Sequence, residues 1–223
     1  MRRRVLSAMS INQNKRIPNN MIVYKTDDES IIEPYFNESF GANLVSNIYI
    51  DGKGQMMFDG DITHIGASAF DNISNITNIE IPNSVMSIGG FAFYWCLALT
   101  NFKVPDNVIS IGESAFDYCI ELTSITLGNS LSHIDNYAFY GCTSLNTITI
   151  PKSITVIGYG AFEGCEMLES VYVKATIPPT LYPYAFLYNT SGRKIYVPRA
   201  SLNAYKTASG WSDYADAIEP YDY

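Results

Sequence analysis

The chain has 223 residues, a net charge of −8 and an isoelectric point near 4.7, with 47% hydrophobic and 16% charged residues. This length predicts one domain with appendages, and the hydrophobic content excludes intrinsic disorder. The acidic balance argues against a nucleic-acid-binding domain, which usually carries a basic face. Because no apolar stretch approaches about 18 residues, we predict no transmembrane helix and no insertion into a membrane.

Residues 1–19 are predicted to form a flexible basic leader. Five basic and no acidic residues lie in it, so the rest of the chain holds 9 basic and 22 acidic residues, a net charge of −13. Anionic membrane surfaces would repel that body. Serines interrupt the short apolar run after Arg2, Arg3 and Arg4, so the leader has no recognisable signal peptide. A basic tail of this kind could dock on a larger assembly.

Residues 20–54 are predicted to form an N-terminal β cap. Met21–Lys25 and Ile31–Pro34 are interpreted as a hairpin around an acidic turn. Asn47–Asp51 is expected to be a further strand, which turns through Gly52–Gly54.

A 23-residue repeat fills the centre of the chain in five in-phase units. Each unit reads Leu-x-x-Ile-x-Ile-Pro, then x-x-Val-x-x-Ile-Gly, then x-x-Ala-Phe-x-x-Cys. The phase is clearest in two columns, Ile65, Ile88, Ile111, Ile134, Ile157 and Phe70, Phe93, Phe116, Phe139, Phe162. Such self-similarity is typical of stacked repeat architectures.

Each unit predicts two short parallel strands and a helical turn. The Ile-x-Ile alternation indicates a strand with one buried face, which proline ends, and a second strand ends at Ile-Gly. Gly112–Cys119 is interpreted as the helical turn. One coil cannot bury its own apolar columns, so we predict a mainly β solenoid over residues 55–198, with coils about 4.8 Å apart. Gln55–Asp59, with apolar Met56 and Phe58, is expected to be a degenerate first coil.

Residues 199–223 are predicted to form a C-terminal cap with a short helix. Tyr184-Ala185-Phe186 repeats the Ala-Phe pair one residue late, and Lys194–Pro198 is the last regular strand expected. Ser201 is interpreted as the N-cap of a helix that ends near Ala208. The residues expected to cover the open core are Leu202, Tyr205, Trp211, Tyr214 and Ile218.

The repeat unit resembles the BspA-like leucine-rich repeats, which are common in bacteria of the Bacteroides group. Ile111–Cys119 and Leu145–Pro151 carry the resemblance, and the flanks Ser39–Asn43 and Ala204–Trp211 are similar to lead-in and closing sequence in such proteins. The resemblance covers residues 20–223. It implies a right-handed solenoid used for binding or adhesion, often on cell surfaces, with no catalytic residue to carry over.

All four cysteines, Cys96, Cys119, Cys142 and Cys165, occupy one column, and Ile73 takes that position one coil earlier. An apolar substitute indicates a buried small hydrophobe. Cysteines of neighbouring coils would have parallel Cβ vectors, which leave the Cβ atoms too far apart for an unstrained bridge. A linear ladder also cannot converge on a metal ion. We therefore predict four free, buried thiols.

The sequence predicts no enzyme, no cofactor and no metal site. His64 and His133 share a repeat position three coils apart, about 14 Å at the strand spacing, and are expected to be exposed at strand ends. Asp27 and Asp28 are expected in a solvated turn. No metalloprotease, nucleophile-elbow, phosphate-loop or dinucleotide motif is present.

Function in a solenoid lies in the variable positions between the fixed columns. Two exposed rows follow the first strand, Asn78, Asn101, Ser124, Thr147, Ser170, Lys194 and Glu80, Lys103, Thr126, Thr149, Tyr172, Tyr196. Small polar side chains are also common on ordinary exposed strands. The candidate partner-binding residues are Phe91, Tyr94, Trp95, Asp117, Tyr118, Tyr137, Tyr140 and Tyr159 on the turn edge, and Tyr172 and Tyr196 on the strand face. Grouped exposed aromatics mark interfaces, but these rings could also simply pack on one another.

These features predict a non-enzymatic binding or adhesion module that recognises a protein or a glycan. The alternative is a structural or display component of an assembly such as a phage or prophage virion, because an arginine-rich start is unusual for an exported surface protein. The resemblance implies a location at the cell surface or outside the cell, whereas the alternative implies association with a virion. A partner other than nucleic acid is expected in either case.

Overall fold

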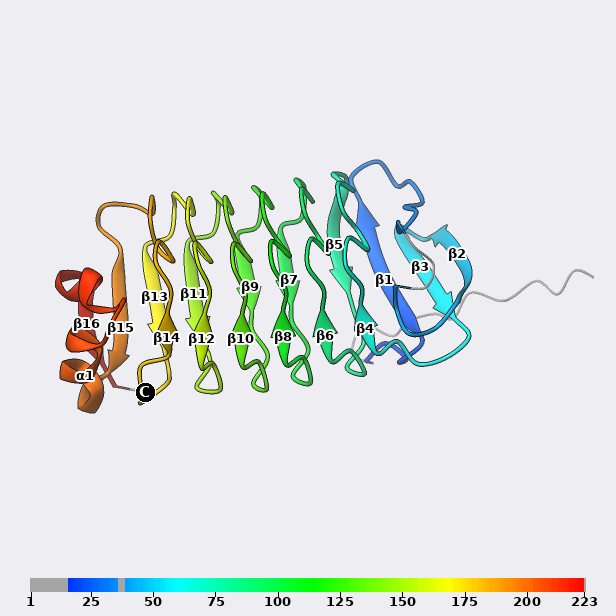
Figure 1. Ribbon diagram of the computed structural model, residues 1–223. Helices are drawn as coiled ribbons and strands as arrows, with labels where there is room; N and C mark the ends of the chain where they lie inside the picture. The colour runs from blue at the N-terminus through cyan, green and yellow to red at the C-terminus, as the bar shows by residue number, and fades with distance from the viewer. Residues whose placement is uncertain (1–15, 36–38, 223) are drawn as a thin grey trace, which may run out of the picture.

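The computed structural model describes residues 16–35 and 39–222. They form an elongated stack of coils with a cap at each end (Figure 1), and one hydrophobic core runs through the stack. The leader prediction falls mainly on residues 1–15, which lie outside the described residues. At its end, the Asn19 carbonyl accepts a hydrogen bond from the Ile62 N–H at 2.8 Å, so this part of the segment contacts the cap.

The N-terminal cap is an antiparallel arrangement of β2 (Leu44–Ile50), β3 (Lys53–Phe58) and β1 (Met21–Thr26), followed by β5 (Ile76–Glu80) in the order β2-β3-β1-β5. The predicted hairpin is wrong, because β3 and β5 occupy both edges of β1 and no strand forms at Ile31–Pro34.

Side chains satisfy the polar backbone of that segment instead of a strand partner. The Ile32 N–H donates to the Tyr24 hydroxyl at 3.3 Å, and the Asn47 amide donates to the Ile32 carbonyl at 2.6 Å. Buried backbone groups need hydrogen-bond partners, and here side chains provide them in place of a neighbouring strand.

Gln55–Asp59 is not a first coil, contrary to the prediction. It lies largely in β3, which β1 separates from β5. Met56 and Phe58 are nevertheless buried, as their apolar character indicates. The turn before β3 is formed by Asp51 and Gly52, both with positive φ, as a two-residue hairpin turn requires.

The predicted solenoid is confirmed between the caps, with two rows of parallel strands around the core. The first row comprises β5, β7 (Asn101–Lys103), β9 (Ser124–Thr126), β11 (Thr147–Ile150), β13 (Ser170–Val173) and β15 (Lys194–Pro198). The second row comprises β4 (His64–Ile65), β6 (Ser87–Ile88), β8 (Ser110–Ile111), β10 (His133–Ile134), β12 (Val156–Ile157) and β14 (Thr180–Leu181). Residues 23 apart pair within each row, as Ile88 does with Ile111. The last step of each row is 24 residues, so that Val171 pairs with Ile195 and Ile157 with Leu181. The ladder of the first row is interrupted between β9 and β11.

The segment predicted as a helical turn is instead a chain of single turns. The N–H groups of Ala115, Asp117 and Cys119 each donate three residues back along the chain. The intervening N–H groups, including those of Ser114 and Tyr118, donate to carbonyls of the next coil. This alternation binds neighbouring coils together, which a helix could not do because its N–H groups all point along its own axis.

The core side of this turn segment carries two ladders. Buried phenylalanines stack from coil to coil, as Phe93 does on Phe116 at 5.0 Å between ring centroids and 12° between ring planes. The cysteines are free and buried, as predicted. Each thiol donates to the phenylalanine carbonyl 26 residues earlier, as Cys119 does to Phe93 at 3.2 Å.

The C-terminal cap comprises η1 (Arg199–Ser201), α1 (Leu202–Thr207), η2 (Ser212–Ala217) and β16 (Ile218–Tyr221). Tyr205, Trp211 and Ile218 are buried at the end of the core, and Leu202 and Tyr214 pack against it, as predicted. None of the helices among the described residues is long and apolar enough to cross a membrane.

Two details of this cap differ from the predictions. Ser201 is the N-cap residue of α1, as predicted, but its hydroxyl donates to the Thr176 carbonyl at 2.7 Å and makes no capping hydrogen bond to the helix. Lys194–Pro198 is not the last strand, because β16 pairs with it in parallel. An edge strand tolerates Pro220, which has no N–H for the ladder.

Candidate functional site

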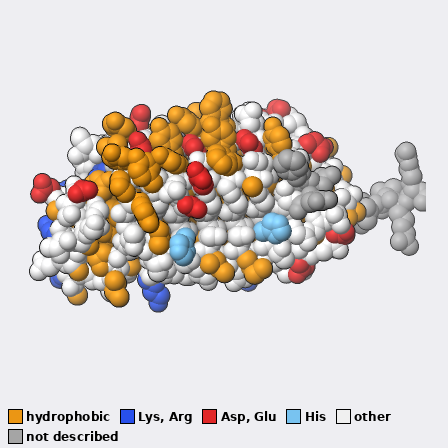
Figure 2. All heavy atoms as spheres, in the orientation of Figure 1, with side chains coloured by type: hydrophobic (Ala, Val, Ile, Leu, Met, Phe, Trp, Pro, Cys, Tyr) orange, Lys and Arg blue, Asp and Glu red, His pale blue; other side chains and the backbone are white. Residues whose placement is uncertain are grey.

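Eight aromatic side chains form a continuous line on the outer side of the turn segment, which we call the aromatic ridge. In order of contact they are Phe91, Tyr94, Trp95, Tyr118, Tyr140, Tyr137, Tyr159 and Tyr184. The centroids of successive rings are 5.0 to 5.9 Å apart. Figure 2 shows hydrophobic side chains gathered along one side of the stack, with carboxylates among them. The rings pack on one another, yet Phe91 and Trp95 stay 40% and 41% exposed.

The backbone of the turn segment holds two columns of residues in the left-handed conformation. They are Ser68, Phe91, Ser114, Tyr137, Gly160, Tyr184 and Asn72, Trp95, Tyr118, Gly141, Gly164, Tyr188. Six of these twelve positions carry a large aromatic ring, although a left-handed φ costs an L-residue roughly 1–2 kcal/mol relative to glycine. Three of the positions, in two coils, are glycine, which shows that the fold itself does not need a side chain at these places.

The structure divides the predicted site residues into two groups. The seven predicted aromatics of the turn edge lie together in the ridge, with Asp117 beside them. Tyr172 and Tyr196 lie on strands β13 and β15, where they stack on each other at 4.8 Å and contact Tyr221. The described residues show no ring contact between these strand-face tyrosines and the ridge.

Sequence reasoning missed Tyr184 and Tyr188 as site residues. Tyr184 extends the ridge by a contact of 5.0 Å with Tyr159, and Tyr188 is the most exposed aromatic nearby at 71%. The last coil is one residue longer than the others, so both tyrosines fall out of the 23-residue phase. If the last coil is aligned on its Ala-Phe pair instead of on the 23-residue spacing, Tyr184 and Tyr188 take the same repeat positions as Tyr137 and Tyr118.

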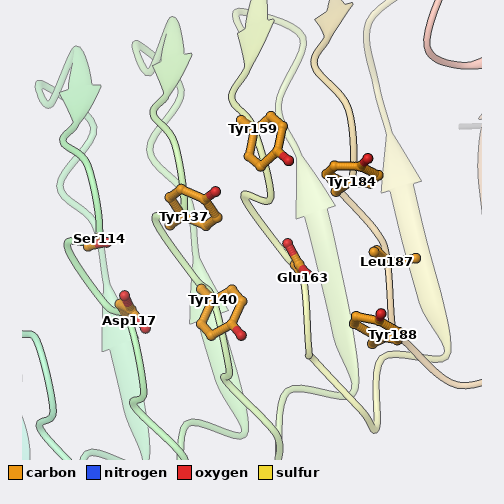
Figure 3. Close-up of a pocket in the computed structure, with 9 residues that line it drawn as sticks. All are labelled: Ser114, Asp117, Tyr137, Tyr140, Tyr159, Glu163, Tyr184, Leu187 and Tyr188. Carbon is orange, nitrogen blue, oxygen red and sulfur yellow. The ribbon is translucent and has the colours of Figure 1, made fainter.

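A groove of about 620 Å³ opens along the ridge where the left-handed positions change from aromatic residues to glycine. Its lining residues are Ser114, Asp117, Tyr137, Tyr140, Tyr159, Glu163, Tyr184, Leu187 and Tyr188 (Figure 3). A Cβ atom at Gly160 would lie only 2.7 Å from the Tyr137 ring, and one at Gly141 only 3.2 Å from the Tyr118 ring. The missing side chains therefore let the preceding rings lie flat and leave the groove open.

Two carboxylates lie in this groove without a cation. Asp117 is 9% exposed, and its Oδ1 atom has no hydrogen-bond partner. Burial raises the pKa of Asp117 to about 6, and the Ser114 hydroxyl offsets part of that effect. Burial also raises the pKa of Glu163. The ion pairs found in the described part of the chain, Lys194–Glu219 and Arg199–Asp222, both lie outside this groove.

Two phenols of the groove, those of Tyr140 and Tyr159, have raised pKa values. Burial raises the pKa of Tyr140, as do its neighbour Tyr118 and the charges of Glu163 and Asp117. Burial and the neighbouring tyrosines likewise raise the pKa of Tyr159, to which Glu163 also contributes. Tyr140 is thus electrostatically coupled to both carboxylates, and it lies between them in the column that contains Asp117, Tyr140 and Glu163 (Figure 3).

No cysteine or histidine is among the described residues that line the groove. Burial raises the pKa of Cys119 and Cys142 well above the ordinary thiol value, which makes them poor nucleophiles. His133 is exposed at a strand end, as predicted, whereas His64 is half-buried, with its Nδ1 atom 3.1 Å from the Thr63 hydroxyl. No group of three potential metal ligands occurs in the described residues.

Comparison with known proteins identifies the repeat. The family model described as "BspA type Leucine rich repeat region" matches residues 63–200 in six copies. A leucine-rich repeat protein of T. pallidum is 28% identical over 66% of this chain and 65% of its own, with a TM-score of 0.49. A leucine-rich repeat protein from Bacteroides ovatus is 28% identical over 70% of this chain and 47% of its own, with a TM-score of 0.47.

A leucine-rich cell surface protein from Faecalibacterium prausnitzii is 22% identical over 63% of this chain and 54% of its own, with a TM-score of 0.43. The match therefore spans less than two thirds of the length of each of these three proteins. No curated protein matches the chain significantly.

Proposed function

The chain belongs to the BspA-type leucine-rich repeat family, and from this premise we propose that it is a non-enzymatic binding module that recognises a protein or a glycan through the aromatic ridge. The observation that carries the proposal is the presence of six aromatic residues at left-handed backbone positions. Strained backbone conformations of this kind cluster at functional sites, where the surrounding structure holds them in place.

The exposure and composition of the ridge support a binding role. Tyrosine and tryptophan bring large, stiff contact surfaces with a polar tip, and they are enriched in interfaces for that reason. Here the rings brace one another through edge-to-face contacts, such as Trp95 on Tyr118 at 5.8 Å. A partner would therefore meet a surface already held in place, which lowers the entropy cost of binding.

We also propose that the module works at a cell surface, as its family suggests. Protease treatment of intact cells of the native host tests this proposal. The chain should be cleaved under conditions that leave a cytoplasmic marker intact, and its protection in intact cells would contradict a surface location.

Binding through the ridge is tested with two variants of the purified chain. The ridge variant combines Phe91→Gly, Trp95→Gly, Tyr118→Gly and Tyr137→Gly, which remove four rings at positions where glycine fits the backbone. The matched control combines Ser68→Gly and Asn72→Gly, in the same two columns of the first coil. Both variants are compared with the native chain on a glycan array and in pull-downs of extracellular host proteins, with circular dichroism to confirm folding.

We expect a specific set of ligands to be retained by the native chain and the control and lost by the ridge variant. Ligands that the folded ridge variant retains equally well would show that binding lies elsewhere, and the strand face around Tyr172 and Tyr196 would then be the next candidate. Turnover of any of these ligands by the native chain would contradict the non-enzymatic assignment.

A further inference from the structure

We infer that the groove at the ridge binds a cationic side chain, a lysine or an arginine, that projects from a protein partner. This inference rests on the proposed function and names the chemistry of the partner. It combines three features of the groove, which are an unpaired buried carboxylate, a second carboxylate with no basic residue in the groove lining, and walls made of tyrosine rings.

The first feature is Asp117. Its side chain is nine-tenths buried, it lines the groove, and its Oδ1 atom accepts no hydrogen bond. A buried carboxylate in that state costs free energy that a native structure rarely leaves uncompensated. A positively charged donor placed in the groove would compensate this negative charge, which the protein itself leaves unpaired.

The second feature is the charge of the whole groove. Glu163 lies two coils from Asp117 in the same column, and the nine lining residues include no lysine, arginine or histidine. An attractive potential for cations therefore remains inside a partly desolvated site, where electrostatic interactions are less screened than on an open surface. The same potential repels acidic glycans and phosphorylated partners.

The third feature is the aromatic wall. Figure 3 shows Tyr137, Tyr140, Tyr159 and Tyr184 arranged around the groove, with the Glu163 carboxylate among them. An ammonium or guanidinium group gains from contact with the face of a tyrosine ring, and the gain is larger where water is excluded. The long apolar stem of lysine or arginine would at the same time cover the ring edges.

These features favour a protein over a neutral glycan. Sugar hydroxyls can donate hydrogen bonds to a carboxylate and can stack on tyrosine, but they bring no charge to balance Asp117 and Glu163. A basic side chain supplies the charge, the donors and the apolar stem in one group. A neutral glycan thus becomes an outcome of the experiment and is not the expected ligand.

The test measures binding of a fluorescein-labelled peptide with three lysines separated by Gly-Ser, by fluorescence polarisation at pH 7.5. Otherwise identical peptides with arginine, glutamine or glutamate in place of lysine serve as comparisons. The variants are Asp117→Asn, Glu163→Gln and Tyr140→Ala, and the matched control is Asp71→Asn. Asp71 occupies the same repeat column as Asp117 but lies outside the groove.

We expect the lysine and arginine peptides to bind and the glutamine and glutamate peptides to bind at least about 10-fold more weakly. Asp117→Asn should weaken binding of the lysine peptide by about 10-fold and Glu163→Gln by about 3-fold, whereas Asp71→Asn should leave it unchanged. Tyr140→Ala should weaken it by about 5-fold, and Tyr140→Phe, which keeps the ring, should not.

Equal binding of the four peptides, no binding of the lysine peptide, or binding that survives the combined Asp117→Asn and Glu163→Gln change would overturn the inference. Binding of a neutral glycan that Asp117→Asn abolishes would also overturn it. If the groove variants bind native partners normally while the glycine variant of the ridge does not, the proposed function stands and the cationic ligand alone fails.

Discussion

Two aromatic ladders run side by side along this solenoid, one inside and one outside. The inner ladder joins Phe70, Phe93, Phe116, Phe139, Phe162 and Phe186, with ring planes within 8° to 13° of parallel. In the outer ladder, the aromatic ridge, most rings meet edge to face, as Tyr159 and Tyr184 do at 89°. The same repeat places both ladders, yet only the inner one is uniform.

The difference shows what the repeat controls. An inner position meets the same surroundings in every coil, so one residue type fills it and identical rings stack. An outer position meets solvent, so serine, glycine, tyrosine or tryptophan can stand there, and each ring adopts the tilt that its neighbours allow. We therefore expect stability to depend mainly on the inner ladder, and we propose that recognition depends on the outer one. The following predictions test that division.

The largest effect is expected from Phe116→Ala in the inner ladder. Phe116 stacks on Phe93 and Phe139 and is fully buried, so its removal leaves a cavity that rigid coils cannot close. We expect the free energy of unfolding to fall by about 3–5 kcal/mol in urea denaturation. Tyr118→Ala, two residues away in the ridge, should cost much less, and equal losses would refute the division.

The next effect concerns Asp117, which lies beside the ridge but is buried. Its pKa of about 6 in the folded chain exceeds the ordinary 3.8, so between these values the native state binds more protons than the unfolded state. The contribution of Asp117 to stability therefore falls as the pH rises from about 4 to 6, by about 2 kcal/mol. The neighbouring groove residues Ser114, Tyr140 and Glu163 are unchanged in the variant Asp117→Asn, which tests this effect.

The variant Asp117→Asn lacks this pH dependence. The difference in unfolding free energy between the variant and the native chain should therefore shift by about 2 kcal/mol in favour of the variant between pH 4 and pH 7. The measurement is the difference in unfolding free energy between the two proteins at both pH values. A difference that does not change with pH would show that this carboxylate is solvated in the folded chain.

A smaller effect is expected from Cys119→Ala on the inner side of the same turn. The substitution removes a buried sulfur and its hydrogen bond to the Phe93 carbonyl, so we expect a loss of about 1 kcal/mol. A thiol reagent should label the remaining three cysteines only after unfolding. Rapid labelling of the native chain would contradict their burial.

The smallest net effect is expected from Trp95→Gly in the ridge. Loss of ring contacts is offset by relief of the left-handed strain, so stability should change by less than about 0.5 kcal/mol. Trp95→Ala keeps that strain and should be less stable than the glycine variant. Denaturation of both variants tests this order, which is the reverse of the usual preference for alanine over glycine.

Most of the solenoid was predictable because its signal is local and periodic. Successive residues within each buried Ile, Phe or Cys column are one repeat apart in the sequence. Counting residues therefore located both the inner ladder and seven rings of the ridge. The caps were harder, since the position of β1 between β3 and β5 depends on pairing between distant segments. β16 was missed because a strand with one buried residue, Ile218, and a proline gives little signal.

The groove could not be predicted from the column pattern alone. It depends on a ring from one coil lying over a glycine of the next, as Tyr137 does over Gly160, and on an unpaired oxygen of Asp117. Both are relations between neighbours in space. The helical turn was wrongly predicted for a similar reason, because the N–H groups of Ser114 and Tyr118 bond to another coil.

The two left-handed columns also affect how such a surface can change over generations. Because glycine is the backbone's preferred residue there, a ring can be lost at these positions with little harm to folding, and one can be gained at modest cost. A mutation at Gly164, where a Cβ atom would make only ordinary contacts, would add to the ridge, and mutations at Phe91 or Trp95 would shorten it. Under the proposed binding role, single substitutions would thus alter the surface offered to a partner while the stack beneath them stays intact.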